Sequence, residues 1–150
     1  MKNLIFVFLL VSLFTFDLNA QVEYKIVSVV ESIVPAGIGR SRILEATDQN
    51  EAEAVTTTRT DGKKSHMSDV KRKDLKINHF KETKLLNFFT LTGINFQNIA
   101  SNDALISDKL NQLAEAGWEL AFLTSGVESD GGELDGKGIF ITRFVFKRGL

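Results

Sequence analysis

The last third of the chain, residues 101–148, constrains the fold most strongly. The run Ser101-Asn102-Asp103 is typical of a helix start, because short oxygen side chains accept hydrogen bonds from the free N–H groups of a first turn. Apolar residues then recur at spacings of four and three and share one helix face: Ile106, Leu110 and Leu113. Gly117 favours a helix stop, because glycine enters the left-handed cap conformation without steric cost. We expect an amphipathic helix that begins near Asn102.

Two strands are expected after this helix. Trp118 follows the glycine directly and predicts a core anchor at the corner. Alternation predicts one side formed by Trp118, Leu120, Phe122 and Thr124, and the other by Glu119, Ala121 and Leu123. Residues 125–138 contain five glycines and four acids, which excludes a strand interior. The apolar run 139–146 follows, so we expect an antiparallel pair joined by a long loop.

The N-terminal half predicts two more strands. Residues 22–34 alternate in their first half and are apolar on both faces in their second, which is typical of a long central strand. Pro35-Ala36-Gly37-Ile38-Gly39 breaks this strand. Residues 40–46 alternate again and indicate a second antiparallel strand, with Ser41, Ile43 and Glu45 set against Arg40, Arg42 and Leu44.

Residues 47–76 contain little core-forming material. An acidic patch begins the segment and a basic cluster ends it: Asp48, Glu51 and Glu53, then Lys63, Lys64, Lys71, Arg72, Lys73 and Lys76. Aspartates are interleaved with the bases and no aromatic residue stands among them. A solvated, flexible insertion therefore explains the cluster better than a nucleic-acid or anionic-surface site. A short strand over residues 55–60 is an open alternative.

Residues 77–99 are apolar again, but their periodicity does not separate helix from strand. The alternatives are a helix face of Leu85, Phe88 and Phe89, or a strand that includes Phe89 and Leu91. Gly93 ends the element in either case. Ile94-Asn95-Phe96 is expected to form a loop that leads into the helix.

Residues 1–20 predict export. Lys2 is a short basic start, residues 4–16 are almost entirely apolar, and Asn19-Ala20 places a small residue before Gln21. This pattern is typical of a secretory signal peptide, and its apolar core is too short for a confident membrane span. We expect a single domain, residues 21–150, in the periplasm or outside the cell and without a membrane segment after cleavage. The chain has no cysteine, so its core alone must stabilise it.

The residues that most enzymes need are missing or isolated. His66 and His79 are the only histidines, neither stands beside a nucleophile, and no G-x-S-x-G motif exists. Gly37-Ile38-Gly39 lacks the third glycine and the helix of a dinucleotide-binding loop. The formal net charge of −1 gives no indication of a nucleic-acid partner. We therefore assign no catalytic, cofactor-binding or metal-binding residue.

Two clusters remain as binding candidates. Four acids among glycines would suit a hard cation such as calcium, although a flexible polar hairpin is the favoured interpretation: Glu128, Asp130, Glu133 and Asp135. Five basic residues at strand positions would form one positive face for an anionic ligand if their strands pair: Arg40, Arg42, Arg143, Lys147 and Arg148. A solvent face balanced by acids is the alternative interpretation of these five.

The run Leu110-Asn111-Gln112-Leu113-Ala114-Glu115-Ala116-Gly117-Trp118-Glu119-Leu120 carries a family resemblance. With the strand Glu23-Tyr24-Lys25-Ile26-Val27 and the closing Phe144-Val145-Phe146-Lys147-Arg148, it resembles the small bacterial domain of unknown function 4177. Residues 92–103 and 138–143 are similar to secreted proteins of Bacteroidetes-type bacteria. The resemblance implies a compact strand–helix–strand–strand domain and no established activity. The long insertion 47–84 departs from it.

We predict an α+β fold, an antiparallel sheet of about four strands with one main amphipathic helix packed on one face. The expected core consists of Tyr24, Ile26, Val30, Ile43, Ile106, Leu110, Leu113, Trp118, Leu120, Phe122, Ile139, Ile141, Phe144 and Phe146. The favoured function is an exported, non-enzymatic module that binds a protein partner or a small anionic ligand. The alternatives are a hydrolytic or cation-dependent enzyme that uses the acidic loop 128–135, and a structural homo-oligomer that uses sheet edges.

Overall fold

The computed structural model describes residues 21–32, 40–48, 51–59, 61–62, 67–127 and 139–150. Its elements in chain order are β1 (Val22–Ser32), β2 (Arg42–Ala46), η1 (Ala52–Val55), η2 (Met67–Asp69), β3 (Phe80–Lys84), β4 (Phe89–Thr90), β5 (Gly93–Ile94), α2 (Phe96–Glu115), β6 (Glu119–Val127) and β7 (Ile139–Gly149). One long helix and an antiparallel sheet make an α+β fold, which confirms the predicted class.

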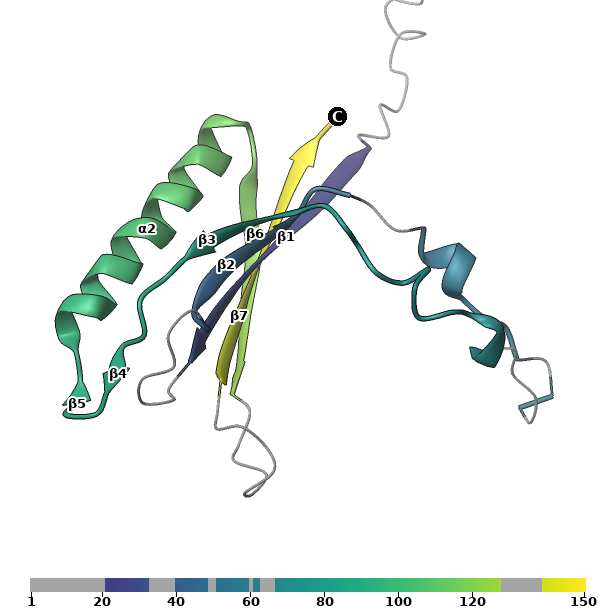
Figure 1. The fold of residues 1–150 in the computed structure, drawn as a ribbon. Helices are drawn as coiled ribbons and strands as arrows, with labels where there is room; N and C mark the ends of the chain where they lie inside the picture. Colours follow the sequence, from purple (N-terminus) through teal and green to yellow (C-terminus); the bar gives the residue numbers. More distant parts are fainter. Residues whose placement is uncertain (1–20, 33–39, 49–50, 60, 63–66, 128–138) are drawn as a thin grey trace, which may run out of the picture.

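Five strands form the main sheet in the order β3-β2-β1-β7-β6, and each neighbouring pair is antiparallel. β1 lies at the centre, as predicted, and pairs with β7 along its whole length. β3 is the strand beyond the predicted four, and it comes from residues 77–99, whose periodicity does not separate helix from strand. β4 and β5 form a small separate hairpin before α2. Figure 1 shows α2 along one face of the main sheet.

α2 begins at Phe96, so the predicted start near Asn102 is wrong. The N-cap is Asn95, whose side-chain oxygen accepts a hydrogen bond from the backbone N–H of Asn98 at 3.1 Å. The other end agrees with the prediction, because Gly117 follows the C-cap with φ of 81°.

Asn102 is fully buried inside α2 and ties the helix to the chain that follows β3. Its side-chain oxygen accepts from the N–H of Leu86 at 2.8 Å, and its amide nitrogen donates to the carbonyl of Leu86 at 2.8 Å. The same nitrogen donates to Glu31 of β1 at 3.3 Å. A residue that resembles a helix cap in the sequence is therefore an internal anchor.

The core lies between α2 and the sheet face formed by the odd-numbered residues of β1. Its buried members are Val27, Val29, Ile43, Leu85, Leu113, Trp118 and Phe146, with Ile106, Leu110 and Phe144 packed against them. The prediction that placed Tyr24 and Ile26 in the core is wrong, because they are 62% and 52% exposed on the opposite face. β1 is apolar on both faces over part of its length, so alternation alone does not show which face the helix covers.

The predicted core residues Val30, Ile139 and Ile141 also lie on the face opposite α2, and a β-bulge in β6 brings Phe122 there as well. Leu120 pairs with Phe146, but the next pair is Phe122 with Val145, so Ala121 is an extra residue in the strand. Leu120 therefore lies on the helix side with Phe146, whereas Phe122 lies on the opposite side. Both are exposed, contrary to the prediction.

β6 also runs further than the sequence predicts. It continues through Ser125 and Gly126 to Val127, all of which pair with β7, although these residues were expected to start the loop. The acids of that loop, at 128–135, lie outside the described residues, as do residues 33–39 at the predicted break after β1.

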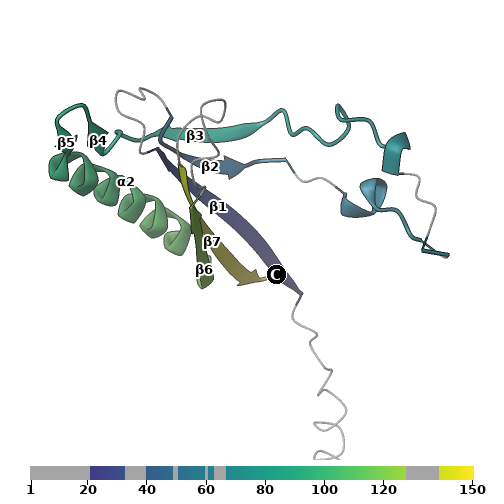
Figure 2. The same ribbon diagram turned by 90° about the horizontal axis from the view of Figure 1, so that it is seen from below.

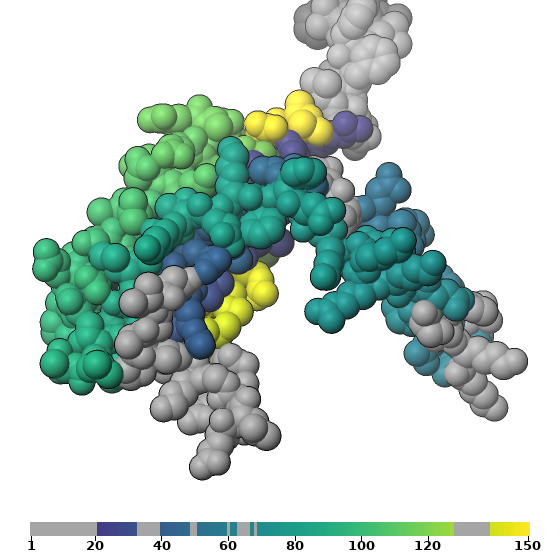
Figure 3. Space-filling view, in the orientation of Figure 1, coloured from purple at the N-terminus to yellow at the C-terminus, as the bar shows by residue number. Residues whose placement is uncertain are grey.

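The described residues between β2 and β3, which are 47–48, 51–59, 61–62 and 67–79, project from the end of the sheet and are here called the arm (Figure 1). At its base the N–H of Thr47 donates to the carbonyl of His79 at 3.3 Å, which continues the β2–β3 ladder. Further out, the described residues form the short turns η1 and η2. Residues 56–59 are not strand, so the alternative of a strand there is wrong. Figures 2 and 3 show the arm on the side away from α2 and clear of the sheet.

Candidate functional site

Glu45 of β2 joins three elements on the helix side of the sheet and is 7% exposed. It accepts a hydrogen bond from Nζ of Lys25 in β1 at 3.0 Å, and its other oxygen contacts Nζ of Lys109 in α2. Burial raises the pKa of Glu45, but the hydrogen bonds and charges of Lys109 and Lys25 outweigh burial and lower the pKa below its ordinary value. Glu45 is therefore an ionised anchor at neutral pH and not a proton donor.

Trp118 is buried at the corner between α2 and β6, as predicted. Two cations lie over its ring, Nζ of Lys25 at 5.0 Å and Cζ of Arg148 at 4.4 Å from the centroid. Arg148 also forms an ion pair with Glu23 at 2.8 Å. The charged residues at this end of β1 and β7 thus cover the core anchor, where cation–π contacts add to packing.

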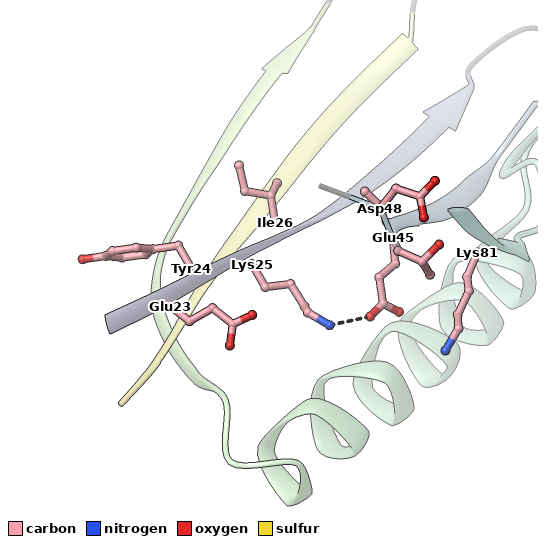
Figure 4. Close-up of a pocket in the computed structure, with 9 residues that line it drawn as sticks. Glu23, Tyr24, Lys25, Ile26, Glu45, Asp48 and Lys81 are labelled. Carbon is pink, nitrogen blue, oxygen red and sulfur yellow. Dashed lines mark hydrogen bonds and ion pairs between the residues drawn. The ribbon is translucent and has the colours of Figure 1, made fainter. Parts of the chain in front are cut away.

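A cavity of about 340 Å³ opens where β1 runs past the end of β2 (Figure 4). Its lining residues are Glu23, Tyr24, Lys25, Ile26, Glu45, Ala46, Thr47, Asp48 and Lys81. Figure 4 shows Lys25 turned toward Glu45, whereas Tyr24 and Ile26 point away to the other side of the sheet. Glu23 and Glu45 are already paired with cations, and Asp48 is hydrogen-bonded to Nδ1 of His79 at 2.8 Å. We therefore interpret the residues that line this cavity as a polar cluster that stabilises the fold.

The sheet face away from α2, here called the open face, carries a second candidate site. It consists of the even-numbered residues of β1 and their cross-strand partners. Its apolar members are Tyr24, Ile26, Val30, Leu44, Phe80, Phe122, Ile139, Ile141 and Val145. Tyr24, Ile26, Phe80 and Phe122 are exposed, and no described helix or strand lies over them. Monomeric proteins rarely expose contiguous apolar patches of this kind without a use for them.

The open face is also predominantly basic. It carries five basic side chains, Arg40, Arg42, Lys84, Arg143 and Lys147, against the two acids Glu82 and Glu119. Arg42 pairs with Glu82 at 2.8 Å and Lys147 with Glu119 at 3.6 Å. The remaining cations give the face an excess of positive charge around its apolar centre.

A hollow of about 480 Å³ lies at the β2–β3 side of this face. Val30, Leu44, Phe80 and Ile139 supply apolar walls, and Arg40, Arg42 and Glu82 line it as well. The hollow is shallow and open, and it combines apolar walls with a few polar groups.

The structure places four of the five basic residues singled out in the sequence on this face. Arg148 is the exception, since it lies on the helix side over Trp118. β1 separates Arg42 from Arg143, so the four are spread over the sheet and not gathered at one point. The apolar part of the site was missed, because six of its nine residues were assigned to the core and Leu44, Phe80 and Val145 were not singled out.

The remaining candidates lie on the arm or beyond the described residues. His79 is exposed and hydrogen-bonded to Asp48. The arm also exposes four basic residues, Lys71, Arg72, Lys73 and Lys76. His66, Lys63, Lys64 and the acidic loop 128–135 lie outside the described residues. Within the described parts of the chain, no group of three or more His, Asp, Glu or Cys residues is placed to hold a metal ion.

No family model, no characterised protein and no solved structure matches the chain. The resemblance to the domain of unknown function 4177 therefore stays a prediction. None of the described helices is both long and apolar enough to cross a bilayer.

Proposed function

We propose that this protein is an exported, non-enzymatic interaction module that binds a protein partner through the open face. The observation that carries the proposal is the apolar, basic and uncovered surface opposite α2. The partner would supply an apolar surface with acidic residues at its rim, because the open face offers aromatic and aliphatic side chains surrounded by an excess of cations.

Two features of the surface support a protein partner. Tyr24, Phe80 and Phe122 are exposed aromatic residues on three different strands, and aromatic anchors supply much of the binding energy at protein interfaces. The apolar surface extends from β3 to β6 across the whole sheet, which suits a protein surface better than a small molecule. The apolar N-terminal run at residues 4–16 supports export.

The test is affinity capture from the envelope fraction with two matched variants. Ile26→Glu places an acid at the centre of the open face, and Leu105→Glu places the same acid on the exposed surface of α2. We expect a partner that the wild type and Leu105→Glu retain and that Ile26→Glu loses. Equal capture by the two variants, or no captured protein that depends on Ile26, would contradict the proposal.

The hollow beside Phe80 favours a second candidate, a small anionic ligand with an apolar body. Anilinonaphthalene sulfonate, an apolar anion, is a direct probe of such a site. We expect its fluorescence to rise with the wild type and to fall by more than half in the Arg42→Ala and Phe80→Ser variants. Unchanged fluorescence in both variants would exclude the hollow as the binding site.

A further inference from the structure

The two edges of the sheet differ in how well they are protected from pairing. β3 is short, and three of its five residues are charged: Lys81, Glu82 and Lys84. β6 has nine residues, and none of residues 120–127 is charged. Lysine-rich, short edges resist pairing with another strand, whereas long uncharged edges favour it.

β6 also exposes apolar side chains on both of its faces. Leu120, Leu123 and Val127 lie on the helix side, and Phe122 lies on the open face. Leu123 is 55% exposed and Phe122 is 57% exposed, although their partners Phe144 and Val145 in β7 are at least half-buried. Every second residue of an edge strand turns its N–H and C=O away from the sheet, so β6 offers backbone groups together with this apolar surface.

We propose that β6 pairs with β6 of a second copy of this chain, antiparallel and across a two-fold axis. The pairing joins two five-stranded sheets into one continuous sheet of ten strands. The expected axis passes close to Thr124, within the regular part of the strand that follows the bulge at Ala121.

A second copy suits β6 because the strand is complementary to itself. In an antiparallel pair about Thr124, Leu123 of each copy lies opposite Ser125 of the other copy on the helix side, and the two Leu123 side chains are diagonal neighbours. Phe122 comes opposite Gly126 on the open face, with Thr124 as its diagonal neighbour. The one charged residue of β6, Glu119, stands at the start of the strand and is paired with Lys147, so no like charges meet along the uncharged stretch.

The pairing also extends the surface described above. The open faces of the two copies would lie side by side in one sheet, with Phe122 of each copy at the seam. The inference does not depend on the proposed partner, because the oligomeric state is measured on the purified protein alone.

Light scattering over a concentration series is the first test, on protein expressed from the full chain and purified. Interfaces of standard size bury about 800 Å² per partner, and one strand pair buries less, so we expect a monomer–dimer equilibrium over roughly 1–500 μM. Leu123→Lys should shift the dissociation constant at least tenfold toward monomer, because lysine on an edge strand opposes pairing.

Two control variants identify the surface that is used. Thr83→Lys makes the same kind of change on the other edge strand, and Ile26→Glu changes the centre of the open face; both should leave the dimer unchanged. Thermal unfolding of each variant confirms that it is folded. A monomer at every concentration, or a dimer that Thr83→Lys or Ile26→Glu disrupts while Leu123→Lys does not, would overturn the proposal.

Disulfide cross-linking is a second, position-specific test. The chain has no cysteine, so no native thiol can form a competing disulfide. A disulfide requires Cα atoms roughly 4.4–6.8 Å apart, which only residues near the two-fold axis satisfy across the pair. Among single-cysteine variants, at least one of Leu123→Cys, Thr124→Cys and Ser125→Cys should form a covalent dimer on mild oxidation, and Thr83→Cys should not. Cross-linking by Thr83→Cys alone would place the contact at β3 and contradict the inference.

Discussion

The two faces of the sheet carry comparable numbers of apolar side chains, but only one face is buried beneath α2. On the helix side, Val27 and Val29 of β1 are buried beneath α2. On the open face, Ile26 of the same strand remains exposed. The number of apolar side chains therefore does not distinguish the two faces. They differ because α2 packs on only one of them (Figure 1). The covered face stabilises the fold, and the described helices and strands leave the open face uncovered.

Charge reinforces this difference. On the helix side, the charged residues Glu23, Lys25, Glu45, Lys109 and Arg148 form a paired cluster around Trp118. On the open face, bases outnumber acids and several have no acid opposite them in the described sheet register. Paired charges help to position α2, whereas the excess positive charge of the open face suits recognition.

The largest expected effect is at the core anchor. Trp118→Ala should lower the free energy of unfolding by about 3–5 kcal/mol, because it leaves a large cavity beneath two cations. Phe122→Ala, in the same strand region but exposed on the open face, should cost less than about 1 kcal/mol. Urea unfolding measures both. Equal losses would mean that the two faces contribute alike to stability.

The second effect concerns Glu45. Glu45→Gln leaves Lys25 and Lys109 without their shared carboxylate and should cost about 3 kcal/mol near neutral pH. Because folding lowers the pKa of Glu45, its contribution is present above the unfolded pKa of about 4.3 and is lost as the pH falls through the folded value. The difference between wild type and variant should therefore shrink on acidification below that pH. The matched control is Glu82→Gln, whose exposed pair with Arg42 should be worth less than about 1 kcal/mol.

The third effect concerns the anchor of α2. Asn102→Ala leaves the backbone groups of Leu86 without their partner and should cost about 2 kcal/mol. Asn111→Ala, on the exposed side of the same helix, should be close to neutral or slightly stabilising. A chemical denaturation series compares the two. A neutral Asn102→Ala would show that the tie between α2 and residue 86 does not contribute to stability.

Local patterns in the sequence predict most of the elements. The alternation of β1 and β2, the helix stop at Gly117 and the apolar run of β7 each depend on neighbouring residues, and each agrees with the structure. The start of α2 was misjudged because Asn102 has the side chain of a cap, yet its partner is Leu86. Only the folded chain brings these two together.

The open face was missed for a related reason. In β1, Glu23 and Lys25 are polar and alternate with Tyr24 and Ile26, which favours burial of the latter two. The polar pair instead lies on the helix side, where Arg148 and Glu45 neutralise it across distant parts of the chain. Val27 and Val29 share the helix side with this polar pair, but Ile26 and Val30 make the opposite face equally apolar, so the alternation of β1 does not identify the buried face. The bulge at Ala121 left no signal either, so Phe122 was also assigned to the core.

The most direct test of the account compares one substitution on the two sides of β1. Ile26→Gln and Val29→Gln introduce the same polar side chain three residues apart, at a site that is 52% exposed and a site that is 3% exposed. We expect the unfolding free energy of Ile26→Gln to lie within about 0.5 kcal/mol of wild type, and that of Val29→Gln to fall by at least about 3 kcal/mol. A loss of several kcal/mol for Ile26→Gln would show that the open face is packed within the fold, and would contradict its role as a binding surface.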